Sequence, residues 1–253
     1  MCVSTNEGWE IVSGGSTARV EKQLNNDEEV VKLQYPNCHD PDLTGRELQR
    51  EYDIYRKLPR HPRLLSLLHD SSPSRLVLPY LPGGTLEARL KTNTEPLSRQ
   101  QRLQLAADAA EAVAVLHANA VIHGDIQLRN FMLDEEGRLI IIDFAGSTLD
   151  GQQGTALEGT RYFLPRQPED PSTVRTDIFA LGTVLYAILA GQELHEGQSE
   201  KAIAELLGNQ DFPYTDDVPC GCTISDCWSG RCASAEQAYQ AISRNLKHCS
   251  ESA

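Results

Sequence analysis

The sequence predicts an α+β fold in which a strand-rich N-terminal part precedes a mainly helical remainder. Residues 9–35 contain two or three short strand-like runs separated by polar turns. By contrast, residues 43–58 and 99–119 have the apolar spacing or composition of helices. The chain has 253 residues, of which 40% are hydrophobic, and this is sufficient for one large domain or two small lobes with a packed core.

The charge balance of the chain narrows its possible partners. The formal net charge of −13 opposes binding to nucleic acid through phosphate contacts and docking on an anionic membrane. The longest apolar run, residues 178–190, is interrupted by Gly182 and Thr183 and is too short to cross a membrane. The N-terminal sequence MCVSTNEGWE lacks the basic and apolar regions of a secretory signal. We therefore expect a soluble protein of the cytoplasm or nucleus that binds neither nucleic acid nor membrane.

The cysteines favour reduced thiols. Seven cysteines in a chain without an export signal do not suggest a disulfide framework. Four of them, Cys220, Cys222, Cys227 and Cys232, are close in sequence, but their spacing is not that of a standard zinc site. We expect buried or incidental thiols, with zinc binding as the alternative.

The turn between the first two expected strands contains Ser13, Gly14 and Gly15, and Val20 lies in the strand that follows. Glycines allow backbone N–H groups to approach phosphates closely, so a loop over nucleotide phosphates uses them. A plain hairpin turn would have the same composition. The turn alone therefore does not establish a nucleotide site.

Lys32 belongs to a strand pattern, residues 28–35, in which side chains alternate between two faces. Its amine is expected to point to the same side as Val30, beneath the glycine turn. Considered alone, Lys32 would be an ordinary solvated lysine. Residues 43–58 then predict an amphipathic helix that carries Glu47 and Glu51.

A change of composition marks the expected domain boundary. Residues 64–68 predict a short strand. The run RLVLPYLPGGTLEARL then changes from a buried strand to a Pro-Gly turn and a helix, which is typical of a linker. We expect one part to comprise residues 1–81 and the other residues 82–253.

Residues 121–147 contain side chains that suit phosphoryl transfer. Asp125 and Asn130 lie in one loop, and Asp143 follows a strand-turn-strand pattern that would return it to that loop. Phosphoryl transfer requires one carboxylate to orient the attacking hydroxyl group. It also requires a second carboxylate, with a carboxamide oxygen, to hold Mg²⁺ against the phosphates. These three residues supply those groups.

The segments HGDIQLRN and IIDFAGS resemble the catalytic loop and the DFG segment of eukaryotic protein kinases. The resemblance spans roughly residues 10–246 and implies a bilobal fold with a small β-rich N-lobe and a mainly helical C-lobe. It implies ATP and Mg²⁺ as cofactors and a protein substrate whose acceptor is serine or threonine, with tyrosine as the alternative. In such a site Asp125 orients the acceptor, while Asn130 and Asp143 hold the metal.

The resemblance also implies a nucleotide site. Only Gly15 and Val20 match the family's glycine-loop pattern, because Ser13 and Ala18 replace its outer glycines. The residues expected to contact the nucleotide are Ser13, Gly14, Gly15, Val20, Val30, Lys32, Pro79, Leu81, Met132 and Asp143.

Within this implied site, adenine would bond to the carbonyl of Pro79 and to the N–H of Leu81. Proline suits the first position because only its carbonyl is needed. Lys32 would hold the α- and β-phosphates. Glu51 would form the ion pair that holds Lys32, with Glu47, one helical turn earlier, as the alternative partner.

Two departures from the family pattern lie in the catalytic loop, and a third, Ala145 in place of glycine, lies in the DFG segment. Gly124 replaces the arginine that anchors a phosphorylated activation segment, so we expect competence without phosphorylation. Gln127 replaces the lysine of serine/threonine kinases that contacts the γ-phosphate. Arg129, which resembles the arginine of tyrosine kinases, is expected to supply that charge.

Other positions have implied structural roles. His123 is expected to pack behind Phe144, with Tyr55 completing the stack. The segment GTRYFLPR, residues 159–166, resembles the family's substrate-binding shelf, but Arg166 replaces a glutamate and we expect neither member of that glutamate's usual ion pair. Asp177 is expected to cap the backbone of the catalytic loop.

Two other functions remain open at this stage. The combined departures are compatible with a pseudokinase, that is, a nucleotide-binding scaffold without turnover. HGD with a downstream asparagine and IDF also resembles the aminoglycoside and choline phosphotransferases, which phosphorylate small molecules. The shelf segment and the helix DIFALG favour a protein substrate. The sequence makes no prediction of oligomeric state.

Overall fold

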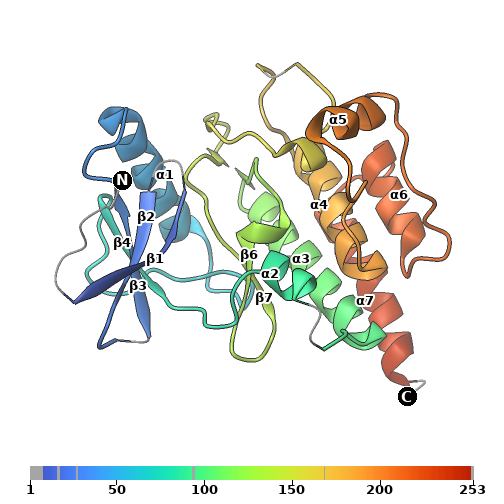
Figure 1. Cartoon of the computed structure of the whole chain (residues 1–253), viewed down its shortest axis with the longest axis horizontal. Helices are drawn as coiled ribbons and strands as arrows, with labels where there is room; N and C mark the ends of the chain where they lie inside the picture. Colours follow the sequence, from blue (N-terminus) through green and yellow to red (C-terminus); the bar gives the residue numbers. More distant parts are fainter. Residues whose placement is uncertain (1–7, 16–17, 27, 93–94, 168, 252–253) are drawn as a thin grey trace.

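The computed structural model describes residues 8–15, 18–26, 28–92, 95–167 and 169–251. A four-stranded antiparallel sheet forms the N-terminal part, and helices with two short strand pairs form the remainder (Figure 1). The predicted α+β class is therefore confirmed. The division into two parts at residue 81 stays a prediction.

The N-terminal sheet has the strand order β1-β2-β3-β4. Its strands are β1 (Trp9–Gly14), β2 (Ala18–Gln23), β3 (Glu29–Gln34) and β4 (Arg75–Pro79). Lys32 of β3 lies directly opposite Val20 of β2 on one side and Leu76 of β4 on the other. Residues paired in this way project from the same face of a sheet, so the Lys32 side chain emerges between apolar neighbours.

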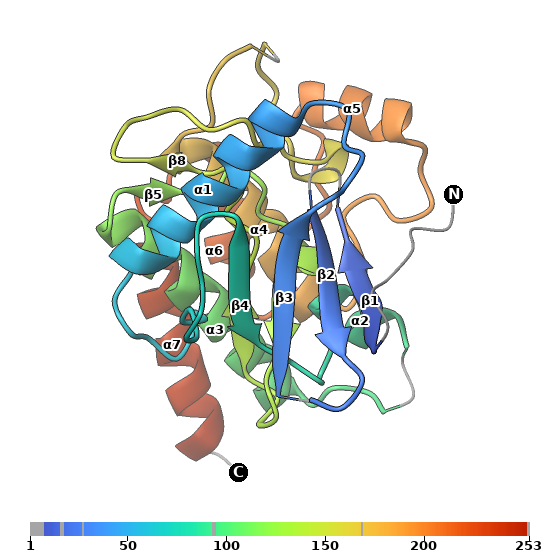
Figure 2. The same cartoon turned by 90° about the vertical axis from the view of Figure 1, so that its left-hand side faces the viewer.

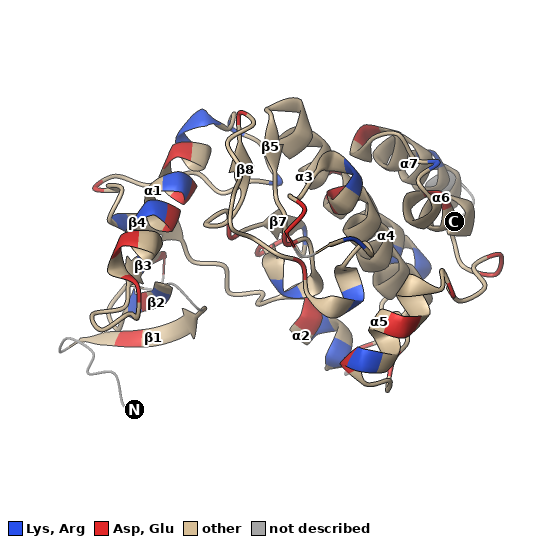
Figure 3. Cartoon of the chain, turned by 90° about the horizontal axis from the view of Figure 1, so that it is seen from above, with Lys and Arg blue, Asp and Glu red and all other residues tan. Residues whose placement is uncertain are grey.

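Helix α1 (Pro41–Lys57) packs against β3 and β4 (Figure 2). Its N-terminus is fixed by Asp40, whose side chain accepts a hydrogen bond from the N–H of Leu43 at 2.9 Å, and by Pro41 in the first turn. Basic and acidic residues alternate along the helix (Figure 3). Two of its acidic side chains, Glu47 and Glu51, are nevertheless buried, which requires partners for both.

The C-terminal helices surround one central helix, α4 (Val174–Ala190), in which residues 176–189 are all buried. Helix α3 packs against both α4 and α7, and α6 packs against α4. The other helices are α2 (Leu86–Lys91), α3 (Arg99–Ala118), α5 (Glu200–Gly208), α6 (Gly221–Ser229) and α7 (Ala235–Glu251). Across the described ranges, none of the helices combines the length and hydropathy needed to cross a membrane.

Short elements connect α3 to α4. Two of them, β6 (Phe131–Leu133) and β7 (Leu139–Ile141), form the hairpin expected between Asp125 and Asp143. The others are β5 (Val121–Ile122), β8 (Thr148–Leu149) and two 3₁₀ turns, η1 (Leu128–Asn130) and η2 (Thr160–Tyr162). Strand β5 pairs with β8, which holds the chain after Asp143 beside the chain before Asp125.

The strand predicted for residues 64–68 does not form. Leu64 makes one isolated bridge to Ile141 of β7, while the N–H of Leu68 bonds to the carbonyl of Val77 in β4 at 2.9 Å. The two ends of this segment therefore bond to different strands, and neither pairing is long enough to form a strand.

A buried carboxylate attaches this segment to the helical part. Asp108 of α3 is 1% exposed, and its carboxylate accepts hydrogen bonds from Arg63 NH1 at 2.9 Å and from Arg138 Nε at 2.7 Å. It also accepts from the N–H of Leu139 at 3.1 Å. One acidic side chain thus joins the loop before β4, helix α3 and the hairpin.

Candidate active site

Lys32 forms two ion pairs on the inner face of the sheet. Its Nζ atom lies 2.6 Å from Glu51 Oε2 and 2.7 Å from Asp143 Oδ1. The side chain of Glu51 is 1% exposed and that of Lys32 is 11% exposed, so little water reaches this pair. Glu47, the alternative partner, instead accepts a hydrogen bond from Thr155 at 2.5 Å. The structure therefore shows the Lys32–Glu51 ion pair that was predicted.

The three charges alter one another's pKa values. Burial acts to lower the pKa of Lys32, but Asp143 and Glu51 outweigh it and raise that pKa above its ordinary value. Burial raises the pKa of Glu51, although Lys32 opposes this effect. Lys32 lowers the pKa of Asp143 against the effect of burial. At neutral pH the lysine is therefore cationic and Asp143 is ionised.

The carboxylate of Asp125 is held by side chains from its own loop. Asn130 Nδ2 donates to Asp125 Oδ2 at 3.0 Å and to the Asp125 carbonyl at 2.8 Å. Gln127 Nε2 donates to Asp125 Oδ1. Arg129 is 62% exposed, and its NH2 atom lies 3.6 Å from Asp125 Oδ2. Both carboxylate oxygens are thus oriented before any substrate binds.

Asp177 fixes the backbone from which Asp125 extends. Its carboxylate is 0% exposed and accepts hydrogen bonds from the N–H groups of His123 at 2.8 Å and Gly124 at 2.9 Å. It also lies 2.9 Å from His117 Nε2. Three groups on two other segments therefore depend on this residue of α4, and the cap predicted for Asp177 is present.

An aromatic stack supports the segment that carries Asp143. The ring of Phe144 lies 5.0 Å from that of Tyr55 and 5.6 Å from that of His123, both in edge-to-face arrangement. His123 Nε2 also lies 3.0 Å from the carbonyl of Ile142. This is the stack predicted from the sequence. It joins α1, the catalytic loop and the DFG segment.

The available donors fit a magnesium ion. Because Asn130 Nδ2 donates to Asp125, the amide oxygen Oδ1 faces the other way. The N–H of Ile142 bonds to the Asn130 carbonyl at 3.0 Å, so the following residue, Asp143, lies beside this loop. The Asp143 side chain is 46% exposed and bonds to Lys32 through Oδ1. A carboxylate and a carboxamide oxygen suit Mg²⁺.

Asp143 adopts a backbone conformation that is uncommon for a residue with a side chain. Its φ is +72°, within the left-handed region. A strained backbone persists only where its surroundings hold it, and such positions cluster at functional sites. Here the ion pair with Lys32 and the stacked Phe144 hold the conformation.

The residues predicted to enclose adenine share one face of the sheet. Val20 lies directly opposite Lys32, and Val30 lies directly opposite Leu78. Met132 of β6 forms an isolated bridge with Thr85 in the segment that follows β4, so β6 lies beside the linker. This arrangement places Met132 beside the segment that joins β4 to α2.

One hydrogen bond to β3 fixes the direction of the backbone just after β4. The N–H of Tyr80 bonds to the carbonyl of Glu28 at 2.8 Å, which directs the backbone groups of Tyr80 toward β3. Backbone groups of neighbouring residues in an extended chain point to opposite sides. The carbonyl of Pro79 and the N–H of Leu81 therefore point away from β3.

The glycine turn is described only at its two ends, and the predicted loop positions Ser16 and Thr17 lie outside the described residues. Ser13 pairs with Val20 in the β1–β2 ladder. A Cβ atom at Gly14 would overlap the Tyr35 hydroxyl oxygen, so a larger residue there would require the Tyr35 side chain to move. Tyr35 thus gives this glycine a packing reason that the sequence did not indicate.

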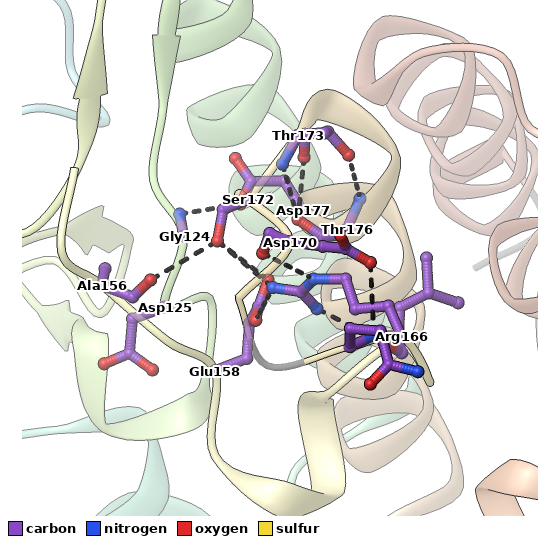
Figure 4. Close-up of polar contacts among 12 residues, drawn as sticks. Gly124, Asp125, Ala156, Glu158, Arg166, Asp170, Ser172, Thr173, Thr176 and Asp177 are labelled. Atoms are coloured by element: carbon purple, nitrogen blue, oxygen red, sulfur yellow. Dashed lines mark hydrogen bonds and ion pairs between the residues drawn. The ribbon is translucent and has the colours of Figure 1, made fainter. Parts of the chain in front are cut away.

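Arg166 has a partner that the sequence analysis did not predict. The family's glutamate is replaced at this position, and Arg166 NH2 lies 2.7 Å from Glu158 Oε2 instead (Figure 4). Glu158 is eight residues earlier in the same segment. The position of Glu158 beside the GTRY motif could have indicated this pairing.

Gln127 was likewise assigned no role because it carries no charge. Its side chain is 7% exposed and donates to Asp125, so it orients that carboxylate without contributing charge. The presence of a polar side chain two residues after Asp125, in the same loop, could have indicated this role.

The cysteines form no cluster with other metal-binding residues. In the described parts of the chain, no group of three or more His, Cys, Asp or Glu side chains is placed to hold a metal ion. Cys227 and Cys232 are buried, whereas Cys222 is exposed. The Cys227 and Cys232 thiols hydrogen-bond to each other, which raises the pKa of Cys227.

Comparison with known proteins identifies a match over nearly the whole chain. A model of the protein kinase domain matches residues 10–248. Aurora kinase A-A of Xenopus laevis is 30% identical over 80% of this chain and 47% of its own length. Serine/threonine-protein kinase PrkC of Bacillus subtilis is 28% identical over 77% of this chain and 32% of its own length.

U-box domain-containing protein 33 of Arabidopsis thaliana is 33% identical over 64% of this chain and 20% of its own length. The chain spans less than half the length of each of these three relatives.

Proposed function

The chain belongs to the protein kinase family, and on this premise we propose that it transfers the γ-phosphoryl group of MgATP to a hydroxyl group of a protein substrate. The observation that carries the proposal is the position of Lys32 between Glu51 and Asp143, at 2.6 and 2.7 Å. A lysine held in this way offers a fixed positive charge to phosphate oxygens. The arrangement also holds Asp143 beside the catalytic loop.

Each side chain of the site has a proposed task. Lys32 binds the α- and β-phosphates, and Glu51 keeps it in place. Asn130 and Asp143 hold Mg²⁺, which neutralises phosphate charge when it is bound. Asp125 orients the acceptor hydroxyl and accepts its proton at the carboxylate. Most of the rate enhancement then comes from positioning and electrostatics rather than from covalent chemistry.

We assign the γ-phosphate contact to Arg129. Its guanidinium group is exposed and lies 3.6 Å from Asp125 Oδ2, so a substrate phosphate could replace this contact. Gln127, which is buried against Asp125, has no charge to offer in this role. In this scheme Gln127 orients Asp125 and Arg129 binds the transferred group.

The adenine site is proposed at the linker. Val20 and Val30 would cover the ring from the sheet side, and Met132 would lie on the opposite side. The carbonyl of Pro79 and the N–H of Leu81 point away from β3, which supports their role in bonding adenine. Ser13, Gly14 and Gly15 would lie near the phosphates.

Serine or threonine is the proposed acceptor. The relatives named serine/threonine-protein kinases support this choice. Arg129 resembles tyrosine kinases instead, so the two signals differ, and analysis of the phosphorylated amino acid decides between them. The match to the protein kinase domain model favours a protein substrate over a small molecule.

The test is a transfer assay with γ-labelled ATP, Mg²⁺ and generic protein substrates. We expect label on serine or threonine with the parent protein, and loss of labelling with Asp125→Asn and with Lys32→Met. Lys201→Met is the matched control because Lys201 is an 88% exposed residue of α5. If the parent protein binds nucleotide but transfers no phosphoryl group, it is a nucleotide-binding scaffold and the proposed kinase activity is wrong.

A further inference from the structure

Gly124 has neighbours where a side chain would otherwise project. Its φ is +76°, and a Cβ atom at this position would lie 3.1 Å from Ala156 Cβ and 3.2 Å from Ser172 Oγ. Its N–H donates to Asp177. The activation segment, residues 147–173, therefore packs directly on the backbone of the catalytic loop, at the residue before Asp125.

Two glycines show that this packing continues along the segment. A Cβ atom at Gly146 would lie 2.8 Å from Ala156 Cβ, and one at Gly154 would lie 1.8 Å from the Gly146 carbonyl oxygen. The N–H of Ala156 also bonds to the Gly146 carbonyl at 2.9 Å. Backbone contact thus holds residues 154–156 against the DFG segment, and the hydrogen bond from Thr155 to the Glu47 carboxylate joins the same residues to α1.

A buried ion pair holds the remainder of the segment. Arg166 NH2 lies 2.7 Å from Glu158 Oε2, and the two side chains are 10% and 0% exposed (Figure 4). The guanidinium group of Arg166 also lies 4.4 Å from the centre of the Phe163 ring, and NH1 donates to the Leu164 carbonyl at 3.3 Å. Removing one member of such a shielded pair strongly destabilises the structure, because the other charge is left buried without a partner.

The two members of the ion pair stand at the two ends of the substrate shelf, residues 159–166. Glu158 precedes its first residue, and Arg166 is its last. Between them, Tyr162 is buried and hydrogen-bonds to the backbone of Leu128 in the catalytic loop. Ser172 Oγ lies 3.4 Å from Glu158 Oε1, which connects the pair to the contact with Gly124.

We propose that Glu158 and Arg166 are positioning residues that hold the substrate shelf against the catalytic loop, so that the chain binds its protein substrate without phosphorylation of the activation segment. The negative charge that a phosphate would supply is replaced by the Glu158 carboxylate, and its cationic partner comes from the shelf itself. This inference rests on the proposed kinase function, because it concerns the site of the protein substrate.

The first test is hydrogen exchange of the whole protein, which requires no activity. Glu158→Gln and Arg166→Gln each remove one charge and keep a similar shape. We expect amide exchange in residues 155–166 to accelerate about tenfold in both variants, and to accelerate less in Arg166→Lys. The matched control is Asp226→Asn, which breaks the more exposed Asp226–Arg231 pair near the end of α6.

The second test is steady-state kinetics on phosphatase-treated protein whose mass shows no phosphate. We expect parent activity to change less than about twofold on phosphatase treatment. We expect Glu158→Gln and Arg166→Gln to raise KM for the protein substrate about tenfold while KM for MgATP stays at the parent value. Asp226→Asn should match the parent in both constants.

The outcomes separate this inference from the proposed function. Equal exchange in Glu158→Gln and Asp226→Asn would overturn the inference even if the parent is an active kinase, as would loss of parent activity on phosphatase treatment. If the parent transfers no phosphoryl group but exchange accelerates in both pair variants, the positioning role stands and the proposed function fails. A thermal melt of each variant with MgATP confirms that it is folded.

Discussion

The ammonium group of Lys32 lies 2.7 Å from the carboxylate of Asp143, although 111 residues separate them in the sequence. Glu51 approaches the same nitrogen from α1 at 2.6 Å. One cation thus joins the sheet, α1 and the DFG segment. The geometry of the proposed nucleotide site depends on this contact, and so does the charge balance around the buried Glu51 carboxylate.

Replacing Lys32 with methionine should destabilise the protein at neutral pH and make its stability increase more strongly as the solution becomes mildly acidic. The buried Glu51 carboxylate would lose its cation, at a cost of about 3–5 kcal/mol, and the half-exposed Asp143 carboxylate would add less because water screens it. Since Lys32 lowers the pKa values of both Glu51 and Asp143, both would rise in the variant. The folded state would then bind more protons than the unfolded state, so its stability should increase as pH falls.

Thermal melts between pH 7.5 and pH 5.5 check this sign. In the parent protein, the raised pKa of Lys32 means that its stabilising contribution is complete below the ordinary lysine value and is lost only at higher pH. Glu51→Gln combined with Lys32→Met should reduce the acid response, because one of the two carboxylates is gone. A Lys32→Met variant that gains no more stability on acidification than the parent does would contradict the ion-pair account.

Gln127→Ala should slow phosphoryl transfer without weakening nucleotide binding. Gln127 donates to Asp125 and is not placed to bind a charged ligand. We expect kcat to fall about tenfold, less than the hundredfold or greater loss expected for Asp125→Asn. Steady-state kinetics give both constants, with Gln240→Ala on the exposed face of α7 as control. An increase in KM for ATP with unchanged kcat would show that Gln127 acts on the nucleotide instead.

Replacing Gly124 with a residue that has a side chain should lower the stability of the protein. Gly124→Ala places a residue with a side chain in the left-handed backbone region, at a cost of about 1–2 kcal/mol. It also brings the added Cβ into contact with Ala156 and Ser172. Gly137→Ala is the matched control, because Gly137 has φ of +72° with no neighbour within 4 Å of the added carbon. Urea unfolding should show a larger loss of unfolding free energy for Gly124→Ala than for Gly137→Ala. Gly124→Arg should lose more still. Equal losses would show that the space beside Gly124 is not limiting.

Asp177→Asn should destabilise the fold and reduce activity together. An asparagine amide cannot accept from His123 and Gly124 through both of its terminal atoms, so one buried N–H would lose its partner. We expect a cost of about 2–3 kcal/mol in the free energy of unfolding and a lower kcat. Asp53→Asn on the exposed face of α1 is the control. Unchanged stability would mean that water replaces the lost acceptor.

Elements with local signals were predicted from the sequence. The amphipathic pattern of residues 43–58 gave α1 at Pro41–Lys57, because one face of that helix is buried and the other is solvated. The Lys32–Glu51 pair followed from the resemblance to the kinase pattern. The Asp125 and Asp143 segments came together because β6 and β7 form a simple hairpin.

Contacts that depend on tertiary packing were not predicted. Residues 64–68 have the composition of a strand, but their backbone groups bond to two different strands. The Glu158–Arg166 pair was not predicted, because only the family's glutamate and its late arginine partner were considered, whereas Glu158 lies eight residues before Arg166 in the same segment. Gln127 was judged by its charge, and its hydrogen bond to Asp125 depends on how the catalytic loop turns.

The two carboxylates on which the account depends have different proposed roles, and calorimetric titration with ATP, with and without Mg²⁺, separates them most directly. We predict that the parent and Asp125→Asn bind MgATP with similar affinity, because Asp125 faces the acceptor. Asp143→Asn should lose the increment of affinity that Mg²⁺ provides. If Asp143→Asn binds MgATP as tightly as the parent does, Asp143 does not hold the metal, and the assignment of this site is wrong.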